Sequence, residues 1–269
     1  MEDQAELLAR MATALERLAP PNEAATDWLD APAYVWNGKA ARAVERIDAP
    51  ERGLLRGIER QKEAVVGNVD RLAHGHAAHD MLLWGARGMG KSALIRTAAR
   101  DAGVALVQVA SDVVASLPSL FALLAKVDRP FLVFVDDLGF AESDAVTPRH
   151  LRSWLDGGVE TRPANIRLAV TSNRRAIQPR QAREQDDPLN PRDAVDDQLA
   201  LADRFGLILG FHNASQDDYL AIVRGYAEHY GFEFEEAEAL EWAKRRGARS
   251  GRVAWHFIAE IAGRTGRRL

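Results

Sequence analysis

Residues 79–100 read HDMLLWGARGMGKSALIRTAAR, and this stretch gives the strongest indication of the fold. Residues 85–92 within it match the pattern G-x-x-x-x-G-K-[ST] at all four fixed positions. An apolar run over residues 81–84 precedes the pattern, and apolar residues at helical spacing follow it. The sequence therefore predicts a strand, a glycine-rich loop and a helix in direct succession.

The glycine-rich loop has the properties that a phosphate chain requires of its binding site. Gly85, Gly88 and Gly90 permit the backbone dihedrals that turn consecutive N–H groups toward a ligand. The following helix adds unpaired amides and the positive end of its dipole. We expect Lys91 to reach the terminal phosphates and the Ser92 hydroxyl to bind Mg2+. The candidate binding residues are Gly85, Ala86, Arg87, Gly88, Met89, Gly90, Lys91, Ser92 and Ala93.

Strand and helix patterns alternate along the rest of the chain. Four more apolar runs read as strands; they are residues 104–109, 131–135, 166–171 and 206–211. Their alternation with helical stretches predicts an α/β fold, with a five-stranded parallel sheet and helices on both faces. Three further helical patterns close the chain; they are residues 215–230, 235–246 and a stretch that begins at Ser250.

Polar residues follow two of these predicted strands where each one ends. Asp136 and Asp137 come directly after the third strand, and Asn173 follows the fourth. The carboxyl ends of parallel strands form the ligand crevice of an open α/β sheet, beside the glycine loop. We expect Asp136 to hold Mg2+ through water or through Ser92, and Asp137 to orient or deprotonate an attacking water. Asn173 is expected to bind the γ-phosphate. Without the glycine loop, the two aspartates would be interpreted as turn residues that cap a strand.

The residues before the glycine loop have less specific patterns. Ile58 opens a helical pattern just upstream of the loop, and two interpretations stand for it: an adenine contact or a plain core position. Trp28, Tyr34 and Trp36 lie among turn-forming residues. They are either a docking surface or, as we expect, aromatic side chains that pack onto the main domain.

Composition and charge exclude several classes of protein. The 269 residues are 47% hydrophobic, which suffices for one large domain or one domain with an appendage. Cysteine is absent, so disulfides and thiolate metal sites are excluded. The first residues lack a basic signal-peptide region and no apolar run approaches the ~20 residues that span a bilayer, so we expect a cytoplasmic protein without a membrane partner.

Charge is distributed unevenly along the chain. The formal net charge of -4 gives no overall attraction to nucleic acid. Residues 178–203 are rich in acids, however, and residues 244–269 are rich in Lys and Arg. Both stretches are interpreted as solvated surface, with interaction with a partner as the alternative.

Five motifs together resemble the AAA+ branch of the P-loop ATPases, and in particular the family catalogued as domain of unknown function 815. They are the glycine loop, VFVDD at residues 133–137, TSNRR at 171–175, LADRFGL at 201–207 and RGARSGRVAWHF at 246–257. The resemblance extends from about residue 54 to the end of the chain. It implies a nucleotide-binding α/β domain over residues 54–211 and a helical lid over 212–269. Apolar residues close to helical spacing between Leu7 and Leu18 predict that residues 1–53 form an N-terminal helical segment.

The resemblance also implies roles for single residues. ATP would be bound by residues 85–92, and Asn173 matches the position called sensor 1. Arg204 matches an arginine finger, which is offered to the γ-phosphate of a neighbouring subunit in a homo-oligomeric ring. Arg252 matches sensor 2 when the last helix is counted from Ser250, and Arg249 remains the alternative.

The functional hypothesis is an ATPase that hydrolyses ATP at a subunit interface to remodel or load a protein partner. Most members of the wider superfamily have Glu where this chain has Asp137, and the shorter side chain predicts slow turnover. Two alternatives stay open: a nucleotide-dependent switch with little turnover, and a loader that acts on DNA, for which the basic C-terminal stretch is the only indication. A protein partner is favoured over nucleic acid because the net charge is negative.

Overall fold

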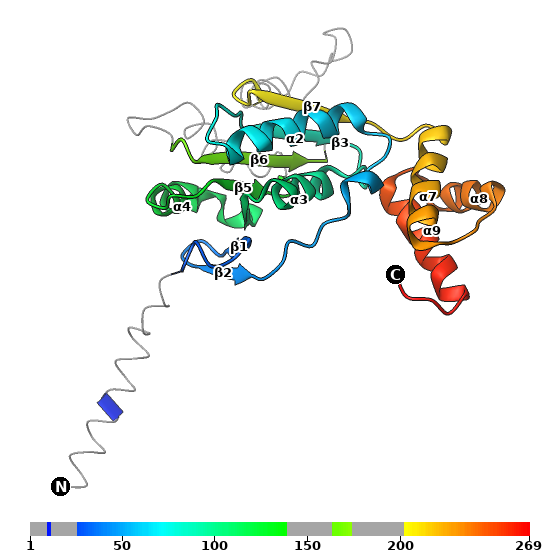
Figure 1. The fold of residues 1–269 in the computed structure, drawn as a ribbon, viewed down its shortest axis with the longest axis horizontal. Helices are drawn as coiled ribbons and strands as arrows, with labels where there is room; N and C mark the ends of the chain where they lie inside the picture. Colours follow the sequence, from blue (N-terminus) through cyan, green and yellow to red (C-terminus); the bar gives the residue numbers. More distant parts are fainter. Residues whose placement is uncertain (1–9, 12–25, 139–162, 174–201) are drawn as a thin grey trace, which may run out of the picture.

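The computed structural model describes residues 10–11, 26–138, 163–173 and 202–269, so most of the acid-rich stretch 178–203 lies outside the described residues. The described chain forms a seven-stranded sheet of order β2-β1-β4-β5-β6-β3-β7 (Figure 1). Neighbouring strands are parallel, except that β2 runs antiparallel to β1. The strands are β1 Ala33–Trp36, β2 Ala41–Val44, β3 Met81–Gly85, β4 Ala105–Val109, β5 Phe131–Val135, β6 Ile166–Ser172 and β7 Leu207–Phe211.

The predicted five-stranded sheet is therefore two strands too small. The five predicted strands are β3 to β7, and β1 and β2 come from the segment that the sequence assigned to N-terminal helix. Each of these two strands has four residues, and β2 is half-buried or exposed throughout, so neither carries the long apolar run of the central strands. The side chains of Trp28, Tyr34 and Trp36 are buried, which confirms the expectation that they pack onto the main domain.

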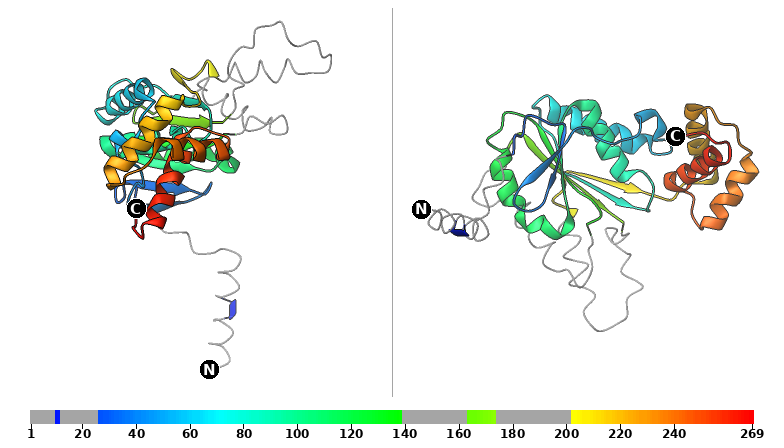
Figure 2. Two further views of the ribbon diagram at one scale, coloured as in Figure 1. Left: turned by 90° about the vertical axis from the view of Figure 1, so that its right-hand side faces the viewer. Right: turned by 90° about the horizontal axis from the view of Figure 1, so that it is seen from below.

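Helices cover both faces of the sheet, as the two views in Figure 2 show. Helices α2 and α3 pack on one face around Val65, Leu94 and Phe134, and α4 packs on the other around Leu120 and Val133. The last three helices form a separate group beside the carboxyl ends of the strands (Figure 1). The helices are α2 Glu59–Ala73, α3 Lys91–Ala102, α4 Leu117–Leu124, α7 Gln216–Tyr230, α8 Glu236–Arg246 and α9 Gly251–Arg264, with short 3-10 turns at Arg52–Leu54 and Ser111–Ser116.

The C-terminal helices begin and end where the sequence predicts. Ser215 and Asp218 form a capping box at the start of α7, in which the Ser215 hydroxyl accepts the Asp218 N–H at 3.1 Å. Gly231 ends α7 with a φ of 66°. At the start of α9, the Ser250 hydroxyl accepts the Val253 N–H at 3.3 Å. These caps fix the residues at which α7 and α9 begin.

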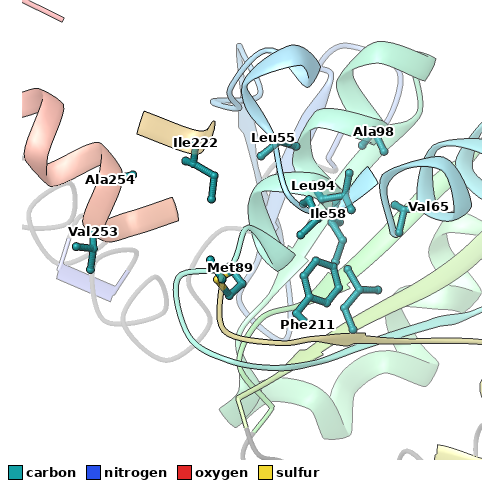
Figure 3. Close-up of a cluster of buried hydrophobic side chains, with 14 of the residues drawn as sticks. Leu55, Ile58, Val65, Met89, Leu94, Ala98, Phe211, Ile222, Val253 and Ala254 are labelled. Atoms are coloured by element: carbon teal, nitrogen blue, oxygen red, sulfur yellow. The ribbon is translucent and has the colours of Figure 1, made fainter. Parts of the chain in front are cut away.

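A continuous apolar cluster joins the C-terminal helices to the sheet domain. Figure 3 shows Leu55, Ile58 and Met89 on one side of this cluster and Ile222 and Val253 on the other. One ion pair adds to the junction, because the Arg56 guanidinium lies 2.9 Å from the Glu228 carboxylate of α7. The C-terminal helices are thus packed against the end of the sheet at which the glycine loop lies.

Candidate functional site

The glycine loop is held against the end of β7 by close backbone contacts. Gly85 has a φ of 120°, and a Cβ there would lie 2.0 Å from the carbonyl oxygen of Phe211. The Ala86 N–H donates to the same oxygen at 2.8 Å. Gly90 has a φ of 87° and immediately precedes α3. Glycine is therefore required at residue 85 by contact and at residue 90 by backbone conformation.

Lys91 begins α3, and its side chain turns back into the loop. The side chain is buried, and its Nζ donates to the carbonyl oxygens of Gly85 and Ala86, each at 2.8 Å. A third hydrogen bond runs to Asn173 Oδ1 at 3.1 Å. An ammonium group has three donors, so all of its hydrogen-bonding capacity is directed into this site.

The protonation of Lys91 reflects this burial. Burial lowers the pKa of Lys91 from 10.5 to about 8, because the charged ammonium loses its hydration. The carboxylates of Asp137 and Asp136 oppose this shift, and the positive charges of Arg252 and Arg87 add to it. The lysine is therefore protonated at neutral pH, and it lies between two aspartates and two arginines.

The acidic strand end lies beside Lys91, as the sequence predicts. The Ser92 hydroxyl donates to Asp136 Oδ1 at 2.7 Å, and the Thr171 hydroxyl donates to the same oxygen at 2.6 Å. The Asn173 amide donates to Asp137 Oδ1. The structure thus brings Ser92, the two aspartates and Asn173 together from three different elements. Sequence reasoning missed Thr171, although its place on β6 next to the end of β5 could have identified it.

Ser92 and Asp136 have the donor atoms that Mg2+ prefers. A hydroxyl and a carboxylate oxygen 2.7 Å apart are hard ligands, and Mg2+ commonly takes one or two protein oxygens and completes its octahedron with water and phosphate. The described residues hold no group of three or more His, Asp or Glu side chains that could bind an ion alone. The donor set therefore fits an ion shared with a phosphate ligand.

A cavity of about 840 Å³ lies between the loop and the C-terminal helices. On the loop side, seven of the nine predicted loop residues line it: Arg87, Gly88, Met89, Gly90, Lys91, Ser92 and Ala93. Gly85 and Ala86 instead direct their carbonyls at Lys91. The opposite wall includes Tyr226 of α7 and Trp255 of α9. Ile58 lines the cavity and also belongs to the apolar core, so both of its predicted roles fit.

The three predicted arginines lie in different places. Arg252 lines the cavity, and its backbone N–H donates to the Gly88 carbonyl at 3.1 Å. Arg249 is exposed and is not among the residues that line the cavity. Arg204 lies just before β7, at the amino ends of the strands, where it lines a second cavity of about 440 Å³ with His79 and Arg167.

Comparison with known proteins agrees with this description. The fold resembles that of solved structures of RuvB from Thermotoga maritima. One of them, described as a Holliday junction branch migration motor, matches with a TM-score of 0.53 and 18% identity, covering 79% of this chain and 65% of that chain. A second RuvB structure matches with a TM-score of 0.56 and 18% identity, covering 82% and 69%.

The family match is more specific than these structural likenesses. Residues 29–265 match the model of the family described as "Protein of unknown function (DUF815)", and the chain belongs to that family. A comparison with curated proteins gives no match. Among the described residues, no helix combines the length and the apolar character needed to cross a membrane.

Proposed function

We propose that this protein binds ATP with Mg2+ and hydrolyses it. The observation that carries the proposal is the convergence of Lys91, Ser92, Asp136 and Asp137 on one cavity at the end of a glycine loop. A cationic side chain, a pair of hard oxygen ligands and a second carboxylate are the parts that phosphoryl transfer to water requires. In this proposal, the residues singled out in the sequence supply each of these parts.

Each side chain has a defined task in this proposal. Lys91 exchanges carbonyl acceptors for phosphate oxygens, which are stronger partners because they are charged. Ser92 and Asp136 would hold Mg2+, and the ion would supply positive charge against the phosphates. Asp137 accepts a proton from the attacking water, and Asn173 positions the Asp137 carboxylate through the hydrogen bond between them. Because Asp137 is one methylene shorter than glutamate, we expect slow turnover.

The C-terminal helices act as a lid in this proposal. The hydrogen bond between the Arg252 N–H, at the start of α9, and the Gly88 carbonyl joins the glycine loop directly to these helices. Arg252 lies in the same cavity as Lys91, which supports a role at the γ-phosphate. Nucleotide exchange would therefore change the contacts between α9 and the loop, and the rotation of α7 to α9 would transmit this change.

We further propose that hydrolysis takes place between subunits of a homo-oligomeric ring. Arg204 lies at the amino ends of the strands, whereas the nucleotide cavity lies at the carboxyl ends, so Arg204 would serve the cavity of a neighbouring copy. Such an assembly would convert hydrolysis into the remodelling or loading of a protein partner.

Measurement of phosphate release tests the hydrolase proposal. The wild-type protein should release phosphate from ATP only when Mg2+ is present. Lys91→Ala should lose both release and ATP binding, with affinity falling on the order of 100-fold, because charge-assisted hydrogen bonds to phosphate are lost. Lys39→Ala is the matched control, since Lys39 is exposed and does not line the cavity. Absence of release from the wild-type protein at concentrations that favour assembly would refute the proposal.

A nucleotide-dependent switch is the second candidate function. It is favoured by the hydrogen bond that engages the Asp137 carboxylate with Asn173, because an engaged carboxylate is a poorer proton acceptor for water. Isolation of partners with and without ATP would distinguish the two. The switch would be favoured if the Asp137→Asn variant binds the same partner as the wild type and releases it on nucleotide exchange.

Action on DNA is the remaining candidate. Its support is the exposed basic run at residues 244–249, together with the printed description of RuvB as a branch migration motor. Fluorescence anisotropy with single- and double-stranded DNA across salt concentrations tests it, since binding to phosphates weakens steeply as salt rises. Absent or salt-independent binding would remove this candidate.

A further inference from the structure

Two consecutive residues, Asp136 and Asp137, face the same cavity at the end of β5, although strand geometry places neighbouring side chains on opposite faces. In β5, Phe134 belongs to the core cluster that α3 covers, and Val135 belongs to the cluster that α4 covers. Continued alternation therefore directs Asp136 toward α3 and Ser92, but it would direct Asp137 away from the nucleotide. The chain must turn between the two residues.

The turn occurs at Asp137 itself. Its φ is 52°, which makes it the one non-glycine residue with a positive φ in the part of the chain that the structure describes. Two hydrogen bonds to β6 hold the turn: the Asp137 N–H donates to the Thr171 hydroxyl at 2.8 Å, and the Leu138 N–H donates to the Thr171 carbonyl at 2.8 Å. Both bonds end on the same residue of the neighbouring strand.

Thr171 also holds the other aspartate. Its hydroxyl donates to Asp136 Oδ1 at 2.6 Å while it accepts from Asp137, so its single proton and one lone pair are both used. The register pairs Val135 with Val170, and Thr171 therefore lies next to Asp136 where the strands end. The side chain is fully buried. One hydroxyl thus joins the two acidic residues.

We propose that Thr171 is the positioning residue that directs both aspartates toward the nucleotide. The proposal rests on the proposed ATPase function, in which Asp136 binds Mg2+ and Asp137 acts on water. It also accounts for an aspartate at residue 137, where most of the wider superfamily has glutamate. A left-handed backbone is tolerated by Asp and Asn better than by longer side chains, so a turn held by Thr171 favours the shorter acid.

Amide hydrogen exchange tests the turn without any ligand. Thr171→Val keeps the shape of the side chain and removes the hydroxyl, so the Asp137 amide should exchange at least about tenfold faster. The Leu138 amide, which donates to the backbone of residue 171, should change much less. Thr171→Ser retains the hydroxyl and should resemble the wild type at both amides. Thr171→Cys, a weak donor and acceptor, should fall between the two and replaces valine if that variant does not fold.

Steady-state kinetics tests the consequence for the reaction. Thr171→Val should lower kcat on the order of 100-fold, because a displacement near 1 Å of a reacting group costs about that much, while KM for ATP stays close to the wild-type value. Thr171→Ser should restore kcat. The control is Thr97→Val, which removes another fully buried hydroxyl, the one that donates to the Pro50 carbonyl at 2.9 Å, and should leave kcat unchanged.

The outcomes separate this proposal from the one on which it rests. Wild-type exchange at Asp137 or wild-type kcat in Thr171→Val overturns the role of Thr171. An equal fall of kcat in Thr97→Val or in Thr171→Ser also overturns it, because the effect then does not belong to this hydroxyl. Absence of hydrolysis in the wild-type protein refutes the ATPase, and amide exchange still decides whether Thr171 holds the turn.

Discussion

The two ends of the sheet are built in different ways. At the carboxyl ends of β3, β5 and β6, polar side chains bind one another: Lys91 donates to Asn173, and Ser92 donates to Asp136. At the amino ends, Arg204 lines a smaller cavity of about 440 Å³. The cavity at the carboxyl ends is organised by contacts within one chain. Arg204 lies at the opposite end of the sheet from that cavity, so its proposed role requires a second subunit.

The residues at the carboxyl ends can be assigned roles from a single subunit, whereas Arg204 cannot. A glycine loop, a helix start and two strand ends converge because the parallel topology brings them to one edge. Arg204 differs from these residues because the topology places it at the amino ends of the strands, away from the nucleotide cavity of its own chain. Its assignment therefore depends on assembly, and experiments on mixtures of subunits test whether it acts between copies.

The largest expected effect is that of Arg204→Ala. If Arg204 completes the site of a neighbour, its loss should lower ATP hydrolysis on the order of 1000-fold, because an arginine that stabilises the transferred phosphoryl group contributes at least that much. ATP affinity should remain near the wild-type value. Phosphate release and calorimetric titration of the same preparation measure the two quantities.

Mixing of two inactive variants provides the control for this prediction. Lys91→Ala cannot hold nucleotide but carries Arg204, and Arg204→Ala binds nucleotide but lacks the arginine. Mixed subunits should recover part of the activity, since some sites then combine an intact loop with an intact arginine. If neither mixing nor concentration changes the rates, Arg204 does not act between subunits.

A smaller effect is expected from Arg252→Ala, at the carboxyl end of the sheet. Loss of one charged hydrogen-bond donor to phosphate should weaken ATP binding or hydrolysis on the order of 30-fold, whatever the state of assembly. Arg249→Ala is the matched control, because this exposed arginine just before the start of α9 does not line the cavity. The reverse result, with Arg249→Ala impaired and Arg252→Ala normal, would exchange the two assignments.

Features at the carboxyl ends of the strands were predictable from the sequence where they have local causes. The glycine loop was predictable because its fixed residues are contiguous and each has a local reason, such as the 2.0 Å contact that a Cβ at residue 85 would make. The central strands were predictable because their residues are buried on both faces and form unbroken apolar runs. The resemblance to the family whose model matches residues 29–265 followed from these local features.

Features that depend on distant contacts were not predictable. β1 and β2 are short, and they exist as strands because β1 pairs with β4, some 70 residues further along the chain, which local patterns do not reveal. Thr171 is the last residue of the predicted strand 166–171, which places it near the site, but only the register of β5 and β6 shows that it lies beside Asp136. The turn at Asp137 is likewise accompanied by hydrogen bonds to β6, which local sequence patterns do not reveal.

The smallest expected effect concerns pH and the charge of Lys91. Burial lowers the pKa of Lys91 to about 8 in the free protein, and bound phosphates would raise it because they favour the charged form. Above pH 8 the free lysine loses its proton, so binding of ATP with Mg2+ must take up a proton and becomes weaker. Affinity should fall about fivefold from pH 8 to pH 9 and stay nearly level from pH 6.5 to pH 7.5.

Calorimetry in buffers of different ionisation enthalpy measures the proton uptake directly. Lys91→Arg, which remains charged throughout this range, should bind with a flat profile, and a flat profile in the wild type would contradict the assignment of Lys91 to the phosphates.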